Sequence, residues 1–180
     1  SIERAYEALV WGAPDRGDPR LAGLRGVSFA RRGEADPALW GRIETQIARS
    51  ASDRKKMAVV SKGGRRAVTW FQVAARFGAA ARPAAAAIEC RLETGRTHQI
   101  RVHLAYAGHG LIGDPSYGRA SASRLDALPA PARAAAAGFG RQALHAGALG
   151  FIHPVTEAPM RFSAPPPEDH VALRAALEAL

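Results

Sequence analysis

The amino-acid sequence predicts an α+β domain in which helices pack on one side of a mixed, mainly antiparallel β-sheet. Several runs rich in β-branched and aromatic residues are separated by turns with Gly and Pro, as in strands paired by hairpins. Apolar residues at helical spacing occur in two further segments, 98–107 and 167–180. The 180 residues suffice for a buried core, and no internal repeat divides them. We therefore expect a single domain over residues 1–180.

Most of the strands are expected in the first half of the chain. The run AYEALVWG at 5–12 alternates in polarity and stops at Gly-Ala-Pro, which indicates a strand. Residues 13–38 are rich in Gly, Pro, Arg and Asp and are interpreted as a loop. Within 55–77, the runs MAVV and AVTWFQVAARF flank Ser-Lys-Gly-Gly and predict a hairpin. Residues 84–93 predict a further strand, which ends at a Thr-Gly turn.

A change of period after this strand predicts a short helix over 98–107. Four residues fall at positions i, i+3, i+4 and i+7 and would share one face: Ile100, His103, Leu104 and Ala107. Thr97 is the expected N-cap, and Gly108 is the expected left-handed residue after the helix. The next segment, GDPSYG at 113–118, predicts a turn.

The C-terminal third is expected to hold a loop, a hairpin and a helix. Residues 119–140 are low-complexity Ala, Ser, Pro and Arg, and are interpreted as a loop insertion with at most one helical turn. Residues 141–165 predict a hairpin whose turn spans 153–159. After three prolines, residues 167–180 predict an amphipathic helix with acidic residues in its first turn.

The charge of the chain favours a polyanionic partner. The net charge is +9 and the pI is about 10.9, values that attract RNA, DNA or an anionic membrane surface. Residues 31–66 alone hold ten basic and four acidic residues. Arg supplies 22 of the 25 basic residues, and its planar fork suits contact with phosphates. Two alternatives remain open: a basic surface without a partner, and an Arg content raised by a GC-rich genome.

The cysteine count and the hydropathy pattern bear on location. Cys90 is the single cysteine, so an intrachain disulfide is impossible, which fits the reducing cytoplasm. No run approaches the roughly 20 apolar residues of a membrane span, and the start lacks the layout of a signal peptide. The chain starts at Ser1 rather than Met, which indicates a cut or processed end. We expect a cytoplasmic protein with no membrane partner.

Two arginines at the predicted 98–107 helix are candidates for anion binding. Arg96 lies just before the helix, where free backbone N–H groups and the helix dipole favour an anion. Arg101 lies about one turn further along and flanks the apolar stripe. Together they could hold a phosphate or a carboxylate. The alternative is that both are solvated arginines on the exposed face of a surface helix.

Metal, nucleophile and nucleotide-cofactor sites find no support in the sequence. His98 and His103 are five residues apart, so they do not stack on a helix face, and no His-Glu-x-x-His occurs. Cys90 lies in an alternating strand and is expected to face the core. Gly-x-Ser-x-Gly, P-loop and Gly-x-Gly-x-x-Gly motifs are lacking. Tyr6, like most strand aromatics, fits a core position, although a strand tyrosine beside a basic site could stack on an extruded base.

One long stretch resembles a known family. LETGRTHQIRVHLAYAGHGLIGDPSYG, residues 92–118, is similar to a hallmark stretch of the RluA-type pseudouridine synthases, which convert uridine to pseudouridine in RNA. ERAYEALVWG resembles the strand that carries the family's active-site tyrosine. RQALHAGALGFIHPVTEAPMRFSAPPPED resembles its closing hairpin. ASDRKKMAVV resembles a segment of members that act on large-subunit rRNA, above all the RluD-like branch. The resemblance covers about residues 2–170 and implies the pseudouridine synthase catalytic fold.

The resemblance implies catalytic roles for three residues. Tyr6 matches the tyrosine that stacks on the target uracil and is proposed to take the C5 proton late in the reaction. Arg101 matches the basic residue that pairs with the catalytic aspartate. Leu144, in Leu-His-Ala, matches the apolar residue that packs against the uracil. The reaction needs no metal and no cofactor, and the target base must leave its stack to reach the pocket.

The resemblance also implies the RNA contacts. One group would support the pocket or contact the RNA backbone: Arg96, Thr97, His98 and Gln99. The basic region 31–66 would hold phosphates, with a run of three at its centre: Arg54, Lys55 and Lys56. The expected partner is therefore RNA, and 23S rRNA in particular.

The sequence departs from the family at the nucleophile. The family's catalytic aspartate lies in His-Arg-Leu-Asp-x-x-Thr-Ser-Gly, upstream of the tyrosine strand, and this chain contains no such motif. Arg124-Leu125-Asp126 spells a similar triplet, but no Thr-Ser-Gly follows it, so we interpret it as coincidence. An S4-like RNA-binding domain is not recognisable either. We expect the chain to be the C-terminal portion of the catalytic domain, with the N-terminal part missing, and to be inactive alone.

Two rival interpretations stay open from the sequence. The first is a non-catalytic RNA-binding module derived from the same family, which would bind RNA without the aspartate. The second is a basic protein–protein adaptor, for which RNA binding that falls steeply with salt would be contrary evidence.

Overall fold

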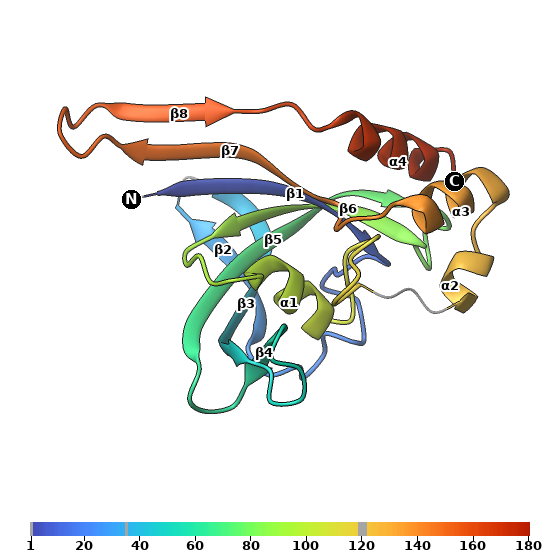
Figure 1. Cartoon of the computed structure of the whole chain (residues 1–180), viewed down its shortest axis with the longest axis horizontal. Coiled ribbons are helices and arrows are strands. Elements are labelled where there is room, and N and C mark those ends of the chain that lie inside the picture. The colour runs from blue at the N-terminus through green and yellow to red at the C-terminus, as the bar shows by residue number, and fades with distance from the viewer. Residues whose placement is uncertain (1, 35, 119–121) are drawn as a thin grey trace.

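An antiparallel β-sheet with helices on both faces forms the framework of the computed structural model, which describes residues 2–34, 36–118 and 122–180 (Figure 1). In chain order the elements are β1 (Glu3–Trp11), β2 (Val27–Gly33), β3 (Asp36–Arg49), β4 (Met57–Val60), β5 (Arg65–Phe77), β6 (Ala85–Leu92), α1 (Gln99–Tyr106), α2 (Ala122–Asp126), α3 (Ala130–Gly138), β7 (Leu144–Ile152), β8 (Pro159–Ser163) and α4 (Glu168–Glu178). The predicted α+β class is confirmed.

The strand order places the first strand near the centre of the sheet. The order is β2-β3-β5-β6-β1-β7-β8, with β4 paired to β3 beside this path. Every pairing between these strands is antiparallel, as the sequence largely predicted. Tyr6 lies opposite Cys90 of β6 on one side and Ala146 of β7 on the other. β1 is therefore supported by neighbours along both of its edges.

Two hydrophobic cores lie on the two faces of β1. Ala8 and Val10 belong to the core beneath α1, whereas Leu9 and Trp11 belong to the core beneath α3 and α4. All four side chains are buried, because a continuous apolar strand needs cover on both faces. The expectation of helices on one side of the sheet is therefore wrong. In Figure 1, α1 and α4 lie on opposite sides of β1.

Part of the predicted loop at 13–38 is strand. β2 occupies Val27–Gly33 and pairs with β3, which starts at Asp36 and runs for 14 residues. β2 is an edge strand whose side chains are mostly exposed. Charged residues are common on such edges because they discourage pairing with other chains. The same charges led the sequence interpretation to a loop.

The predicted hairpin at 55–77 is also wrong in its pairing. β4 and β5 form where expected, but each pairs with β3 and not with the other. Gln46 of β3 lies between them, opposite Val60 on one side and Arg66 on the other. The backbone N–H of Gly64 donates to the side chain of Gln46, 3.1 Å away, where the connection from β4 to β5 crosses β3. The long β3 strand, which the sequence interpretation missed, takes the partner position.

The ends of α1 agree only in part with the prediction. Gly108 has a φ of +81° and follows the helix as expected. Thr97 is not the N-cap, since that position belongs to His98, which is left-handed (φ 57°) and makes no capping side-chain bond. Instead, the side-chain oxygen of Gln99 accepts a hydrogen bond from the backbone N–H of Arg96 at 2.9 Å. The first residue of the helix thus stabilises the backbone segment that leads into the helix.

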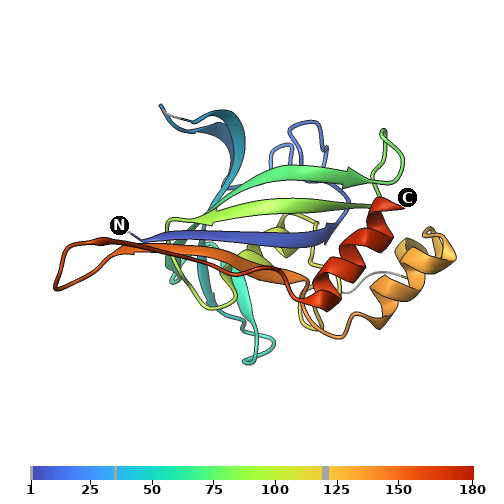
Figure 2. The same cartoon turned by 90° about the horizontal axis from the view of Figure 1, so that it is seen from above.

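The segment 119–140 is not a loop throughout. Its first three residues lie outside the described part of the chain, and the rest contains α2 and α3. Ala132 and Ala136 of α3 are buried in the same core as Leu173 and Leu177 of α4. The two helices lie side by side at one end of the molecule (Figure 2). The alanines of this low-complexity segment are small enough to allow close helix packing.

The C-terminal hairpin and helix are confirmed. β7 and β8 pair with Leu149 opposite Phe162, and the hairpin extends beyond the rest of the sheet (Figure 1). α4 has Glu168 and Asp169 in its first turn. Among the described residues, no helix combines the length and the apolar character needed to cross a membrane.

Truncating a side chain of the second core tests how much α4 contributes to stability. Replacing the buried Leu173 with Ala should lower the free energy of unfolding by about 2–5 kcal/mol, because it leaves a cavity. Val171→Ala on the same helix is the matched control, since Val171 is 49% exposed, and should change it by at most about 0.5 kcal/mol. Urea denaturation measures both. Equal effects of the two changes would contradict this account of the core.

Candidate active site and RNA-binding surface

Alternation along β1 brings two predicted site residues to one face of the sheet. Tyr6 and Leu144 both pack against the core beneath α1. Leu144 lies directly opposite Ala8 of β1, and cross-strand partners point to the same face. Tyr6 is half-buried, and its hydroxyl makes no hydrogen bond within the described part of the chain. Its ring is thus partly accessible on the side of the sheet that α1 covers.

Arg101 of α1 is held in a two-pronged ion pair with Asp114. Its Nε lies 2.7 Å from Oδ2 and its Nη2 lies 2.7 Å from Oδ1. The arginine side chain is only 12% exposed and the aspartate side chain is fully buried. The guanidinium also stacks over the ring of Tyr117 at 4.9 Å. The orientation of the Arg101 guanidinium is therefore fixed before any ligand binds.

The ionisation of this pair follows from its hydrogen bonds. Burial opposes the charge on Asp114, but Arg101 and the backbone N–H groups of Ser116 and Tyr117 outweigh it, so the pKa of Asp114 lies below its usual value. The hydrogen bond to Asp114 in turn raises the pKa of Arg101. Nη1 of Arg101 makes no hydrogen bond among the described residues. That nitrogen remains available to a further acceptor.

Asp114 is the site residue that sequence reasoning missed. The Gly-Asp-Pro turn was visible, but only the fold shows that its aspartate lies against Arg101, 13 positions earlier in the chain. The sequence interpretation expected Arg101 to pair with an aspartate outside this chain. In the structure the Nε–Nη2 edge of Arg101 is already occupied by Asp114.

The residues before α1 divide into accessible and buried ones. Thr97 is exposed, and Arg96 donates from Nε to the backbone carbonyl of Arg66 at 3.0 Å. Gln99 is 2% exposed, and its amide nitrogen donates to the carbonyl of Val68 at 2.9 Å and to the hydroxyl of Thr69 at 3.0 Å. Of the two predicted roles for Gln99, only support of the pocket fits, because its polar atoms are already satisfied inside the protein.

His98 joins α1 to the basic turn that precedes β4. Its Nδ1 lies 3.0 Å from the hydroxyl of Tyr117, which accepts a hydrogen bond from the backbone N–H of Met57 at 2.7 Å. Burial, and then the charge of Arg101, lower the pKa of His98. A neutral His98 can accept the Tyr117 hydroxyl proton. This chain of contacts fixes β4 beside the start of α1.

The predicted phosphate contacts Arg54, Lys55 and Lys56 lie in this same turn. Arg54 and Lys55 are exposed, and Lys56 forms a surface ion pair with Asp53 at 3.5 Å. Met57 follows directly and bonds to Tyr117. The fold thus brings a basic run from position 54 onwards to the end of α1 where Arg96 and Thr97 lie, as an extended anion-binding surface would require.

The buried histidines have structural partners. His103 lies between Thr69, 2.8 Å from Nδ1, and Thr45, 2.9 Å from Nε2, and burial lowers its pKa to about 4. It ties α1 to both β5 and β3. His109 bonds to the carbonyl of Trp11 at 2.8 Å. The described residues contain no group of three or more His, Cys, Asp or Glu that could hold a metal ion.

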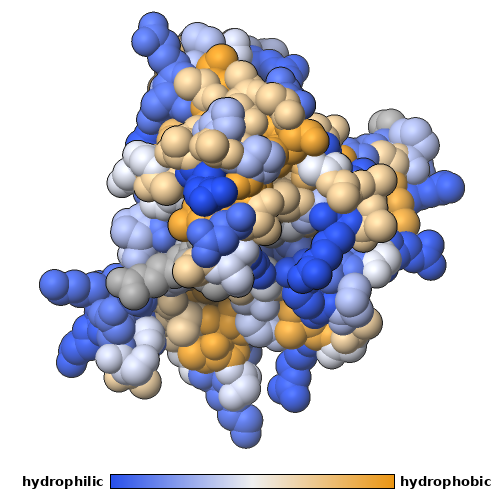
Figure 3. Space-filling model, turned by 90° about the vertical axis from the view of Figure 1, so that its right-hand side faces the viewer, coloured by the Kyte–Doolittle hydropathy of each residue, from blue (hydrophilic) through white to orange (hydrophobic). Residues whose placement is uncertain are grey.

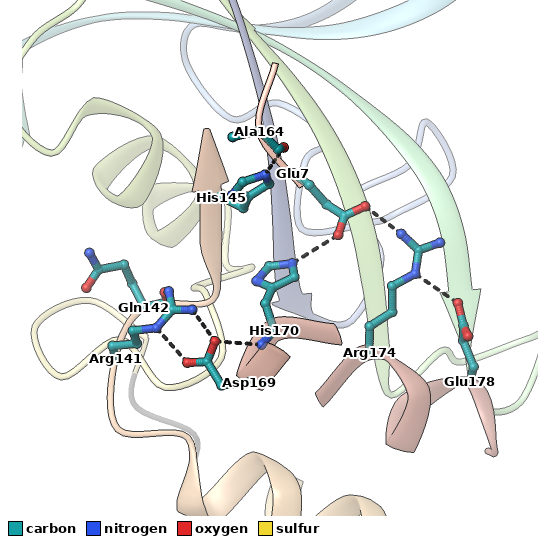
Figure 4. A network of polar contacts seen from close by, with 9 residues as sticks. All are labelled: Glu7, Arg141, Gln142, His145, Ala164, Asp169, His170, Arg174 and Glu178. Atoms are coloured by element: carbon teal, nitrogen blue, oxygen red, sulfur yellow. Dashed lines mark hydrogen bonds and ion pairs between the residues drawn. The ribbon is translucent and has the colours of Figure 1, made fainter. Parts of the chain in front are cut away.

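A second polar network lies on the opposite face of β1 (Figure 4). Glu7, next to Tyr6, accepts a hydrogen bond from Nε2 of His170 at 2.9 Å and pairs with Arg174, both from α4. The bond from His170 holds the pKa of Glu7 below its usual value. Asp169 forms a two-pronged pair with Arg141. This network was not predicted, and it anchors α4 directly behind the tyrosine.

Comparison with known proteins assigns the chain to a family. The family model described as RNA pseudouridylate synthase matches residues 1–106. The chain belongs to this family. The resemblance found in the sequence is thereby confirmed.

Named relatives support the assignment. Ribosomal large subunit pseudouridine synthase D of Zymomonas mobilis is 44% identical over 161 residues, which cover 84% of this chain and 47% of that protein. The protein of the same name from Xanthomonas campestris is 49% identical over 140 residues, 76% of this chain and 39% of that protein. The chain thus spans less than half of the length of these two relatives.

Solved structures support the fold. Human RNA Pseudouridylate Synthase Domain Containing 1 matches with a TM-score of 0.58 at 22% identity, over 92% of this chain and 55% of that chain. Human RNA Pseudouridylate Synthase Domain Containing 4 matches with a TM-score of 0.59 at 19% identity, over 98% of this chain and 62% of that chain. The described sheet and helices therefore have the architecture of these pseudouridylate synthase domains.

Breaking the buried ion pair should cost stability. Asp114→Asn leaves the charge of Arg101 largely buried without its partner and should lower the free energy of unfolding by about 3–5 kcal/mol. Glu178→Gln, which breaks an exposed pair with Arg174, is the control and should cost at most about 1 kcal/mol. Thermal and urea unfolding measure both. A loss for Asp114→Asn no larger than the control's would mean that the pair does not hold the site together.

His103 predicts a pH dependence of stability. Its pKa is lowered to about 4, so the unfolded chain binds a proton at higher pH than the folded chain does. Stability should therefore fall as the pH drops from about 6.5 towards 4, with a slope of up to about 1.4 kcal/mol per pH unit. His103→Gln should flatten the slope between about pH 6.5 and 5. An unchanged slope in that variant would assign the dependence to other groups.

Proposed function

We propose that this chain forms the uridine-binding part of an RNA pseudouridine synthase that acts on large-subunit rRNA. The observation that carries the proposal is the placement of Tyr6 and Leu144 on the face of the sheet that α1 covers, in a chain of this family. The names of the Zymomonas and Xanthomonas relatives support ribosomal large-subunit RNA as the substrate. We propose that this reaction takes place in the cytoplasm, where rRNA is found. A single cysteine, which cannot form an intrachain disulfide, fits that reducing compartment.

The chemistry asked of the site is an isomerisation. The bond from C1′ of the ribose to N1 of uracil breaks, a bond from C1′ to C5 forms, and the proton on C5 is replaced by one on N1. No group or electron is gained overall, so the proposal includes no metal and no cofactor. The target nucleotide must leave the helical stack to reach the sheet. Tyr6 would stack on the uracil, and Leu144 would pack against it.

Arg101 is proposed to orient the aspartate nucleophile. Its Nε–Nη2 edge is held by Asp114, which leaves Nη1 for a second carboxylate. An arginine fixed in this way would lower the pKa of that carboxylate and keep it ionised. The aspartate motif does not occur in this chain, so the proposal assigns it to residues beyond this sequence.

The basic surface is proposed to bind the phosphates around the target. The run from Arg54 to Lys56 and the residues before α1, Arg96 and Thr97, would contact the backbone and set its register. The main rival is a non-catalytic RNA-binding module of the same family, which would bind RNA without the aspartate. If the chain were a protein–protein adaptor, its binding affinity should depend only weakly on salt. Affinity for RNA, in contrast, falls steeply as the salt concentration rises.

The proposal predicts how activity depends on Arg101. This chain alone should form no pseudouridine in unmodified 23S rRNA. A chimera that joins it to the N-terminal part of a relative with the His-Arg-Leu-Asp motif should be active. In that chimera Arg101→Ala should lower kcat by about a hundredfold or more, while RNA affinity stays within about twofold. Nucleoside mass spectrometry and filter binding measure the two quantities.

Each outcome separates the alternatives. Pseudouridine formed by the chain alone would overturn the assignment of the nucleophile to residues beyond it. A chimera that binds RNA but makes no product would favour the non-catalytic module. If RNA affinity falls in parallel with kcat in Arg101→Ala, Arg101 is a phosphate contact instead. Arg101→Lys keeps the charge but loses the fork, so it tests whether geometry matters.

A further inference from the structure

A large cleft lies away from the proposed uridine site. It has a volume of about 1020 Å³ and is formed mainly by three segments, with Leu180 beside them: 12–20 after β1, 78–84 between β5 and β6, and 123–129 from α2 to the start of α3. Figure 3 faces this end of the molecule, where hydrophilic and hydrophobic side chains are interspersed. Tyr6, Arg101 and Leu144 are not among the residues that line it.

Each of the three segments contributes an arginine to the cleft. These are Arg20, Arg82 and Arg124. The side chains of the lining also include two carboxylates, but both are already paired. Asp15 accepts two hydrogen bonds from Arg76, and Asp18 pairs with Arg20 at 3.1 Å and with the buried His109. Both aspartate side chains of the cleft are therefore already paired.

Arg82 and Arg124 remain without a counter-ion. Neither side chain makes a hydrogen bond or an ion pair with any residue in the described ranges 2–34, 36–118 and 122–180. Arg124 is half-buried, and burial followed by the positive charge of Arg20 lowers its pKa. The guanidinium groups of Arg20 and Arg124 therefore repel each other, and an anion bound between them would relieve that repulsion. Phosphate oxygens match the fork of donors that each arginine presents.

The rest of the lining indicates what kind of anion fits. Its described residues are mainly Ala, Gly and Pro, with Leu128 and Leu180. None of these lining residues is aromatic, so the cleft offers no platform for a base to stack on. A phosphodiester backbone, which needs charge and room but no stacking, suits this lining better than a nucleobase does.

We propose that this cleft is a second RNA-binding site that holds backbone phosphates through Arg124, Arg82 and Arg20. The RNA assignment rests on the proposed function, whereas the anion-binding chemistry rests on the cleft alone. Gly12, at the edge of the cleft, follows Tyr6 by six positions along the chain, which is about 20 Å of extended strand. The cleft would therefore hold nucleotides that flank the target and would raise affinity without touching the reacting base.

This proposal also gives a role to the Arg124-Leu125-Asp126 triplet. Leu125 packs against the core shared with α4, which fixes the short α2 helix, while Asp126 is exposed and does not line the cleft. Arg124 is therefore the member of the triplet that faces the cleft. Its position depends on helices that a loop insertion would not provide.

The test compares charge-removing variants of the chain. Arg124→Gln and Arg82→Gln lie on different segments of the cleft, and Arg161→Gln on β8 is the matched control, because Arg161 is exposed and outside the cleft. Inorganic phosphate and a short single-stranded RNA of mixed sequence are the two probes. Amide and arginine Nε–Hε signals in NMR spectra locate binding, and fluorescence anisotropy over a range of salt concentrations gives RNA affinity.

Both probes should shift the signals of residues 78–84 and 123–129. Arg124→Gln should weaken RNA binding about fourfold near 0.15 M salt and reduce the salt slope by about 0.7, as the loss of one phosphate contact predicts. Arg82→Gln should act in the same direction, and Arg161→Gln should leave both quantities unchanged. Preserved dispersion of the amide spectrum shows that each variant is folded.

The outcomes distinguish this proposal from the proposed function. If neither probe shifts the cleft signals, or if Arg124→Gln and Arg82→Gln bind RNA as the wild type does, the second RNA site is wrong. If phosphate shifts the cleft signals but Arg124→Gln leaves the RNA affinity unchanged, the cleft binds a small phosphorylated ligand instead. That result would overturn the RNA assignment. Arg124-dependent RNA binding alongside a chimera that makes no pseudouridine would support the cleft and remove only the proposed activity.

Discussion

The structure depends on the burial of both faces of β1. From Ala8 to Trp11 the strand is apolar on every residue, so it requires one hydrophobic layer beneath α1 and another beneath α3 and α4. β6 and β7 satisfy its backbone along both edges. Tyr6 lies at the point where this continuous burial gives way to partial exposure, and it can therefore be both rigidly held and accessible.

Polar contacts then orient α1 on that frame. His103 contacts the hydroxyls of threonines on two strands, and Gln99 bonds to β5. These bonds fix both the rotation of α1 about its axis and its distance from the sheet. Asp114 fixes the Arg101 guanidinium, and Tyr117 supports it from the side. An arginine fixed this way loses little conformational freedom when a ligand binds, which is the general advantage of preorganised sites.

Positive charge is distributed over separate surfaces of the molecule. One cluster of basic residues lies in the turn before β4, beside α1. A second cluster lies in the cleft at the end of the sheet, around Arg124. Many other arginines are paired, as Arg66 and Arg42 are with Glu44. The total of 22 arginines thus overstates the number that are free to meet a polyanion, and the pairing decides where the unpaired ones lie.

Local patterns in the sequence determined the family, β1, the α1 helix, the C-terminal hairpin and α4, because each depends on residues close together in the chain. Local patterns could not predict which strands pair. The charged β3 strand was missed, and β4 and β5 were joined to each other instead of to it, since pairing is a competition between distant segments. The same reason applies to the Arg101–Asp114 contact and to the cleft, whose arginines meet only once the sheet and helices have packed.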